Sequence, residues 1–78
     1  MVGIVSTMNP VNPKKLHHSK WTAVQPRNKE KHFLVTDVIL DADGHPQTCS
    51  LEAVLSRREI RLDWRELEDS TRWRIGWL

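Results

Sequence analysis

Four tryptophans in a short chain with a single cysteine constrain the fold of this protein more than any other feature. The chain has 78 residues, and its lone cysteine, Cys49, excludes an internal disulfide and the four-cysteine and Cys2His2 zinc patterns. A chain of this size buries only about 60–65% of its unfolded surface, so its core is thin. Each tryptophan can bury about 200–250 Å², more than any other side chain. We therefore expect the core to be built on Trp21, Trp64, Trp73 and Trp77.

The same composition bounds the class and location of the protein. A single cysteine fits a reducing compartment, so we expect a cytoplasmic protein. No run approaches the roughly 20 apolar residues of a membrane span, and the apolar residues 1–5 are too few for a signal peptide. Met1 and Met8 are both acceptable start residues. We expect one domain over residues 14–78, preceded by a flexible arm or extended strap over residues 1–13, which hold two prolines and no usable period.

Charge is distributed unevenly along the chain. Residues 1–36 carry a net charge of +5 and residues 37–78 a net charge of −3, which gives +2 in total. This asymmetry indicates an anionic partner for the N-terminal half, although a lysine-rich edge that discourages aggregation is the simpler alternative. The basic residues of this half, which are the candidate contacts, are Lys14, Lys15, Lys20, Arg27, Lys29 and Lys31.

The first half of the domain has the pattern of two β-strands and a hairpin turn. Residues 20–25 alternate weakly, and Pro26 is expected to end that strand because it cannot donate a ladder hydrogen bond. Residues 32–40 are rich in β-branched and bulky side chains but apolar on both faces, which suits a bent strand with a bulge near Asp37. Residues 41–44 (Asp-Ala-Asp-Gly) then predict a tight turn.

Residues 47–64 admit two interpretations. Alternation over residues 47–56 and again over residues 60–64 predicts a second hairpin. The alternative is an α+β fold with a helix near residues 50–59, because that stretch is rich in helix formers and Ser50 is a suitable cap. We favour the strands because the alternation continues on both sides of the turn.

The C-terminal residues predict one helical turn and a last short strand. Asp63 and Glu66 have the spacing of a capping box, and residues 65–69 should form one helical or 3₁₀ turn with Leu67 facing inward. Residues 73–77 alternate again. The sequence thus predicts an all-β fold: a small, five-stranded, antiparallel SH3-like barrel with one short helical turn before the last strand.

Several separated segments resemble a known group of proteins. The segments are Ser19–Pro26, Lys31–Phe33, Leu51–Ser56 and Leu62–Leu67, with Trp73 and Gly76-Trp77 near the end. Together with Asn12–Leu16 they resemble a family of small tryptophan-rich bacterial proteins of unknown function, over residues 12–78. The resemblance implies a bacterial, single-domain protein and supplies no catalytic residues.

The residues do not form a recognisable catalytic or cofactor-binding pattern. Cys49 is expected on an apolar strand face, where a thiol is an inert small hydrophobe. The acids of the 41–52 segment fail the calcium-loop pattern because Pro46 replaces the required glycine. With three glycines there is no phosphate loop. We expect no enzyme activity, no metal, no cofactor, no small-molecule substrate and no membrane association.

Two binding hypotheses remain. In the first, exposed tryptophan anchors a protein partner or self-association, with Trp73 and Trp77 as the anchors and Arg72 and Arg74 beside them. In the second, Trp21 stacks on a base of single-stranded RNA or DNA among the basic residues of the N-terminal half. We expect a non-enzymatic binding or adaptor module and favour the protein partner. The sequence names neither the partner nor the oligomeric state.

Overall fold

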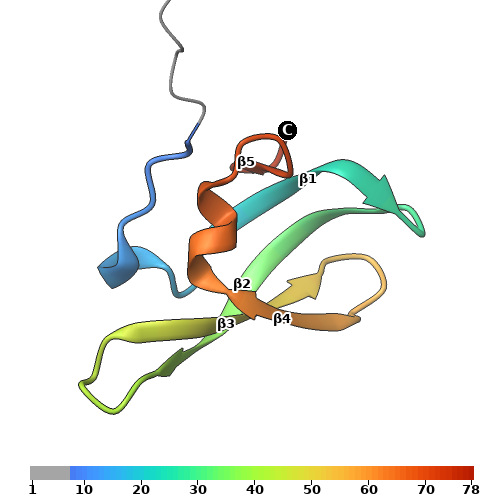
Figure 1. The fold of residues 1–78 in the computed structure, drawn as a ribbon. Helices are drawn as coiled ribbons and strands as arrows, with labels where there is room; N and C mark the ends of the chain where they lie inside the picture. Colours follow the sequence, from blue (N-terminus) through green and yellow to red (C-terminus); the bar gives the residue numbers. More distant parts are fainter. Residues whose placement is uncertain (1–7) are drawn as a thin grey trace, which may run out of the picture.

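A computed structural model describes residues 8–78, which form one antiparallel sheet with two short 3₁₀ helices (Figure 1). The sheet has five strands in the order β4-β3-β2-β1-β5. The elements in chain order are η1 (Pro13–Lys15), β1 (Lys20–Arg27), β2 (Glu30–Leu40), β3 (Pro46–Ala53), β4 (Glu59–Asp63), η2 (Trp64–Glu68) and β5 (Trp73–Ile75).

The mostly-β fold and the helical turn before the last strand are as predicted, but the sheet is not closed into a barrel. Among residues 8–78, β4 and β5 are the two edges of the sheet and do not pair with each other. The reason is local: η2 fills the interval between these strands and contacts both of them, and β5 is only three residues long. The structure therefore corrects the prediction of a closed barrel to an open, coiled sheet.

The alternative helix near residues 50–59 is wrong. Residues 51–53 belong to β3, where Leu51 pairs with Ile60 and Cys49 pairs with Leu62 of β4. Period-two alternation places Cys49, Leu51 and Ala53 in the core, whereas a helix would have left part of that stripe in water. The turn that follows uses Arg57 at a φ of 65°.

Two details of the first strands qualify the predictions. The register of β2 against β3 shifts between Val35 and Asp37, which confirms the expected bulge. In contrast, β1 does not end at Pro26 but continues to Arg27. Pro26 is tolerated because the β1–β2 ladder is irregular between Thr22 and Arg27, so the backbone N–H that proline lacks is not needed for a ladder hydrogen bond there.

The core is built around two indole rings and not around all four as expected, because Trp64 is only partly buried against it and Trp77 is exposed. Trp21 and Trp73 are buried, and Trp73 packs edge-on against the Phe33 ring with 5.3 Å between the ring centroids. Leu67 of η2 closes this core from the β4–β5 side, and the predicted capping box of Asp63 and Glu66 starts η2. The remaining buried apolar residues are Leu16, Val35, Cys49, Leu51 and Ala53.

The segment before η1 lies in extended form against η2 and β5. The side-chain amide of Asn9 donates to the carbonyls of Leu67 and Trp73, each at 2.8 Å, and the Asn9 backbone amide donates to Glu68. The part of the expected arm that the structure describes is therefore tied to the domain as a strap, which we define as residues 8–12. Residues 1–7 of that arm lie outside the described residues.

Candidate functional site

The basic residues of the N-terminal half do not form one edge. Lys14 and Lys15 lie on η1 near Lys20 at the start of β1, whereas the other three lie at the β1–β2 hairpin, on the opposite side of the molecule (Figure 1). An eight-residue strand spans about 23 Å, so β1 keeps the two groups apart. The proximal group is Lys14, Lys15 and Lys20, and the distal group is Arg27, Lys29 and Lys31.

The tryptophans that were candidate anchors are also separated. Trp21 is 3% exposed and Trp73 is 5% exposed, so neither indole is free to stack on a base or enter a partner's pocket. Trp77 is 41% exposed and is the accessible indole of the three. Of the two arginines that flank Trp73, Arg74 is the middle residue of β5 and pairs with Thr22 of β1. Arg72 lies immediately before the first residue of β5.

The last three residues fold back over the outer side of β1 and β2. Gly76 has a φ of +81°, a conformation that favours glycine, and it turns the chain out of β5. The Thr22 hydroxyl donates to the Gly76 carbonyl at 2.6 Å and accepts from the Leu78 amide at 3.0 Å. A His32 ring nitrogen lies 2.9 Å from the Leu78 carbonyl. We call residues 76–78 the C-terminal latch.

The latch holds the exposed indole in one orientation. The Trp77 indole N–H donates to the Phe33 carbonyl at 2.9 Å, and the Lys20 ammonium lies 4.8 Å from the ring centroid. The His32 ring is tilted relative to the Trp77 ring, with 6.0 Å between the two ring centroids. An aromatic ring fixed on several sides loses little conformational entropy when it binds a partner.

An apolar groove of about 340 Å³ lies beside the latch, between the strap and the end of β5. We call it the lysine-flanked groove, because two cations of the proximal group stand at its rim and no acid lines it. This groove brings together three of the predicted site residues, Lys15, Lys20 and Trp21, and the ammonium of one of them, Lys20, also contacts the Trp77 ring. Its apolar lining comes chiefly from Val11, Leu16, Trp21 and Ile75.

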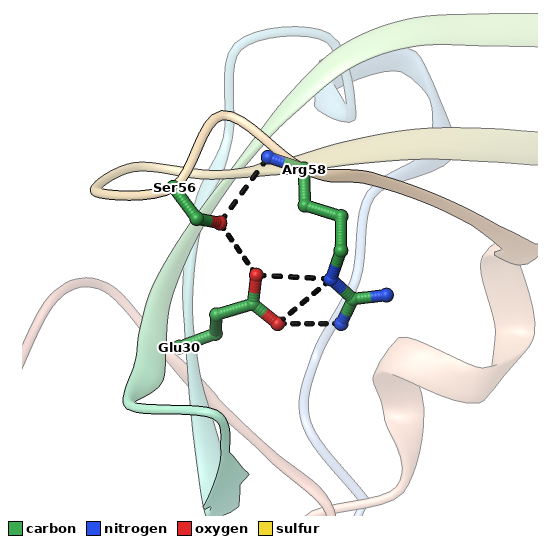
Figure 2. Close-up of polar contacts among 3 residues, drawn as sticks. All are labelled: Glu30, Ser56 and Arg58. Atoms are coloured by element: carbon green, nitrogen blue, oxygen red, sulfur yellow. Dashed lines mark hydrogen bonds and ion pairs between the residues drawn. The ribbon is translucent and has the colours of Figure 1, made fainter.

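A polar cluster that the sequence did not reveal joins the β1–β2 hairpin to the β3–β4 turn (Figure 2). Glu30 is only 5% exposed, and the Arg58 Nε lies 3.0 Å from each of its carboxylate oxygens. The Ser56 hydroxyl donates to Glu30 and accepts from the Arg58 amide at 3.2 Å. The sequence signal was slight: Glu30 is the one acid among the cations of the N-terminal half.

This cluster sets the ionisation of its carboxyl group. The hydrogen bonds from Arg58 and then Ser56 lower the pKa of Glu30 from 4.5 to about 2, against the opposing effect of burial. The hydrogen bond to Glu30 and its negative charge raise the pKa of Arg58. Glu30 therefore stays charged at any neutral or mildly acidic pH.

The depressed pKa of Glu30 predicts an acid-dependent loss of stability. The folded carboxyl holds its proton less tightly than the unfolded one, so its contribution is complete above about pH 4.5 and is lost as the pH falls toward about 2. We expect Glu30→Gln to be less stable than the wild type at pH 7. The gap should narrow between pH 4.5 and 2 in urea titrations; a gap that is independent of pH would contradict this role.

Two other groups considered as chemical sites have structural explanations. Cys49 is fully buried, and burial raises the pKa of its thiol to about 11, so it is not a thiolate at neutral pH. Asp41, Asp43 and His45 lie close together on the exposed β2–β3 turn. The Asp41 carboxylate accepts from the backbone amides of the other two at 2.9 Å, which is the bonding of an Asx turn.

Comparison with protein families gives one match. The model of a family described as tryptophan-rich protein (DUF2389) matches residues 19–78. The chain belongs to this family. The DUF2389 match confirms the resemblance seen in the sequence and includes all four tryptophans. It begins after η1, so the strap and Lys14–Lys15 lie outside it.

The other comparisons give the DUF2389 chain no further relative. Searches of curated proteins and of solved structures found no match. Within residues 8–78, no helix is long and apolar enough to cross a membrane.

Proposed function

We propose that this protein is a non-enzymatic protein-interaction module that binds through Trp77 and the lysine-flanked groove. The observation that carries the proposal is the indole of Trp77, which is 41% exposed yet held by the Phe33 carbonyl and the Lys20 ammonium. Rigid, exposed aromatic side chains beside a cation are the typical hot spots of protein interfaces. Leu78 adds further exposed apolar surface next to this ring.

The chemistry of the groove defines the partner. A volume of about 340 Å³ with a largely apolar lining suits one or two apolar side chains of an extended segment. Lys15 and Lys20 at the rim, with Lys14 adjacent, favour carboxylates in the same segment. The proposed partner is therefore a protein segment in which acidic residues alternate with aliphatic ones.

The scaffold and compartment are part of this proposal. The strand order β4-β3-β2-β1-β5 with a 3₁₀ turn before β5 supports an SH3-like arrangement, opened at the β4–β5 seam. SH3-like domains serve many functions, so this likeness does not by itself indicate a partner. The unpaired, buried Cys49 supports a reducing compartment, which we propose is the cytosol.

Selection from a random peptide display library tests the proposal directly. We expect enrichment of acidic–aliphatic sequences, and we expect Lys15→Glu/Lys20→Glu to abolish that enrichment by reversing the rim charge. The matched control, Lys29→Glu/Lys31→Glu, makes the same charge change at the distal hairpin and should leave the selected sequences unchanged. Failure to enrich any sequence, or equal loss in both double variants, would contradict the proposed site.

Single-stranded nucleic acid is the alternative partner, and the proximal lysines are the observation in its favour. The separation of the two basic groups and the burial of Trp21 count against it. Binding of this kind weakens steeply with salt, and Lys14, Lys15 and Lys20 changed to alanine should flatten that dependence. Fluorescence anisotropy with labelled single-stranded RNA at low salt tests this alternative, because an absence of binding there would exclude nucleic acid as the partner.

A further inference from the structure

A second cavity, of about 300 Å³, lies away from the lysine-flanked groove. It opens between the tips of the β1–β2 and β3–β4 hairpins and the start of β5. Its apolar lining comes from Ala23, Phe33 and Trp73. We call it the arginine pocket, because its polar lining includes Arg27, Arg58 and Arg72 together with Glu30.

The arginine pocket has an excess of positive charge. Arg58 is paired with Glu30, and Arg72 lies 3.1 Å from a carboxylate oxygen of Glu66. Arg27 has no ion pair or side-chain hydrogen bond in the part of the chain that the structure describes. Three guanidinium groups thus meet two carboxylates, and the charge of one cation is left for a ligand.

One of the apolar residues that line the pocket carries an unsatisfied hydrogen-bond donor. Trp73 is 5% exposed, and its indole N–H is buried without a partner among residues 8–78. Buried polar groups are partnered in the large majority of cases, because leaving one unpaired destabilises the folded protein. The lining of one pocket therefore includes an unpaired cation, Arg27, and a residue with an unpaired buried N–H, Trp73.

We propose that the arginine pocket binds a small organic carboxylate that carries an apolar group. The carboxylate contacts Arg27, and the apolar group lies on the Phe33 and Trp73 rings. Arg58 binds the Glu30 carboxylate side-on at the edge of this pocket, in the planar geometry by which a guanidinium pairs with a carboxylate (Figure 2). The apolar lining disfavours a fully hydrated inorganic anion.

Two sources of such a carboxylate are compatible with the size of the pocket. A volume of about 300 Å³ is at the lower end of the usual range of about 300–1,000 Å³ for ligand pockets. A free small acid fits this volume, and so does the last residue of a peptide, with its terminal carboxylate. Both sources present the same chemistry to Arg27.

An NMR titration of protein labelled with ¹⁵N-tryptophan tests this proposal. The probes are phenylacetate, its neutral isostere phenylacetamide, and a short peptide ending in phenylalanine with either a free or an amidated C-terminus. We expect the free acids to shift the Trp73 indole N–H, and the neutral partner of each pair to bind at least about tenfold more weakly. Whichever free acid binds more tightly identifies the source of the carboxylate.

Two variants distinguish binding in the arginine pocket from a general effect of positive charge on the surface. Arg27→Gln should weaken phenylacetate binding about tenfold or more while the spectrum stays that of the folded protein, because Arg27 is exposed and unpaired. Arg74→Gln removes the same charge from β5 two residues after Arg72 and should leave the affinity unchanged. The proposal is overturned if no probe shifts Trp73 at millimolar concentration, if phosphate binds as tightly as phenylacetate, or if both variants weaken binding equally.

Discussion

Replacing Trp73 with alanine is expected to lower the free energy of unfolding by about 3–5 kcal/mol, the range for large aromatic residues in cores. Trp73 is buried, packs edge-on against Phe33 and lies on the strand that joins the end of the chain to β1. A domain of 78 residues has a total stability of about 4–12 kcal/mol, so the loss is a large share of it. Urea titration followed by circular dichroism measures the change.

The neighbouring tryptophan provides the comparison for this prediction. Trp77→Ala removes a side chain of the same size that is 41% exposed and makes one hydrogen bond, so we expect a loss of only about 1 kcal/mol. Arg74→Gln should change the stability by less than about 0.5 kcal/mol. A Trp73→Ala protein that is no less stable than Trp77→Ala would show that the core is not centred on Trp73.

Trp77→Ala should instead act on binding, and there its effect should be large. For an acidic–aliphatic peptide obtained by display selection, we expect the affinity to fall about 30- to 1,000-fold, which corresponds to the 2–4 kcal/mol of a hot-spot residue. The physical reason is that the latch holds the indole in place, so its contacts with a partner are made at little entropic cost. Isothermal titration calorimetry measures the change.

A matched control for this variant is available on the far hairpin. Leu55 is 85% exposed at the β3–β4 turn, where it is neither in the lysine-flanked groove nor in the latch. Leu55→Ala removes exposed apolar surface and should leave the peptide affinity unchanged. Equal affinities for the wild type and Trp77→Ala would remove Trp77 from the interface, and equal losses in the two variants would indicate non-specific adhesion.

The parts of this fold that depend on neighbouring residues were readable in the sequence. Alternation put Cys49, Leu51, Ala53 and Leu55 on one face, and the structure buries the first three there. Leu55 is 85% exposed because β3 ends at Ala53 and Leu55 lies in the turn that follows. The capping box of Asp63 and Glu66 depends on a spacing of three residues and formed as expected. Strand identity, turns and caps are local, so a single sequence carries enough information for them.

The parts that depend on distant residues were not readable. The Glu30–Arg58 pair joins residues 28 positions apart, and the Asn9 side chain bonds the carbonyl of Trp73, 64 positions away. Barrel closure likewise depended on how two edge strands meet. The alternation of Trp73 and Trp77 was misleading because the φ of Gly76 turns the chain out of β5 between them, which leaves one indole buried and the other exposed.

The central claim is that β1 and β5 pair around two buried indole rings and leave a third ring exposed on the latch. A soluble paramagnetic agent added to protein labelled in its tryptophan rings measures this directly, because relaxation of each ring's signals reports its access to solvent. We expect strong relaxation for Trp77 and weak relaxation for Trp21 and Trp73. Relaxation of Trp73 as strong as that of Trp77 would contradict both the core and the proposed interface.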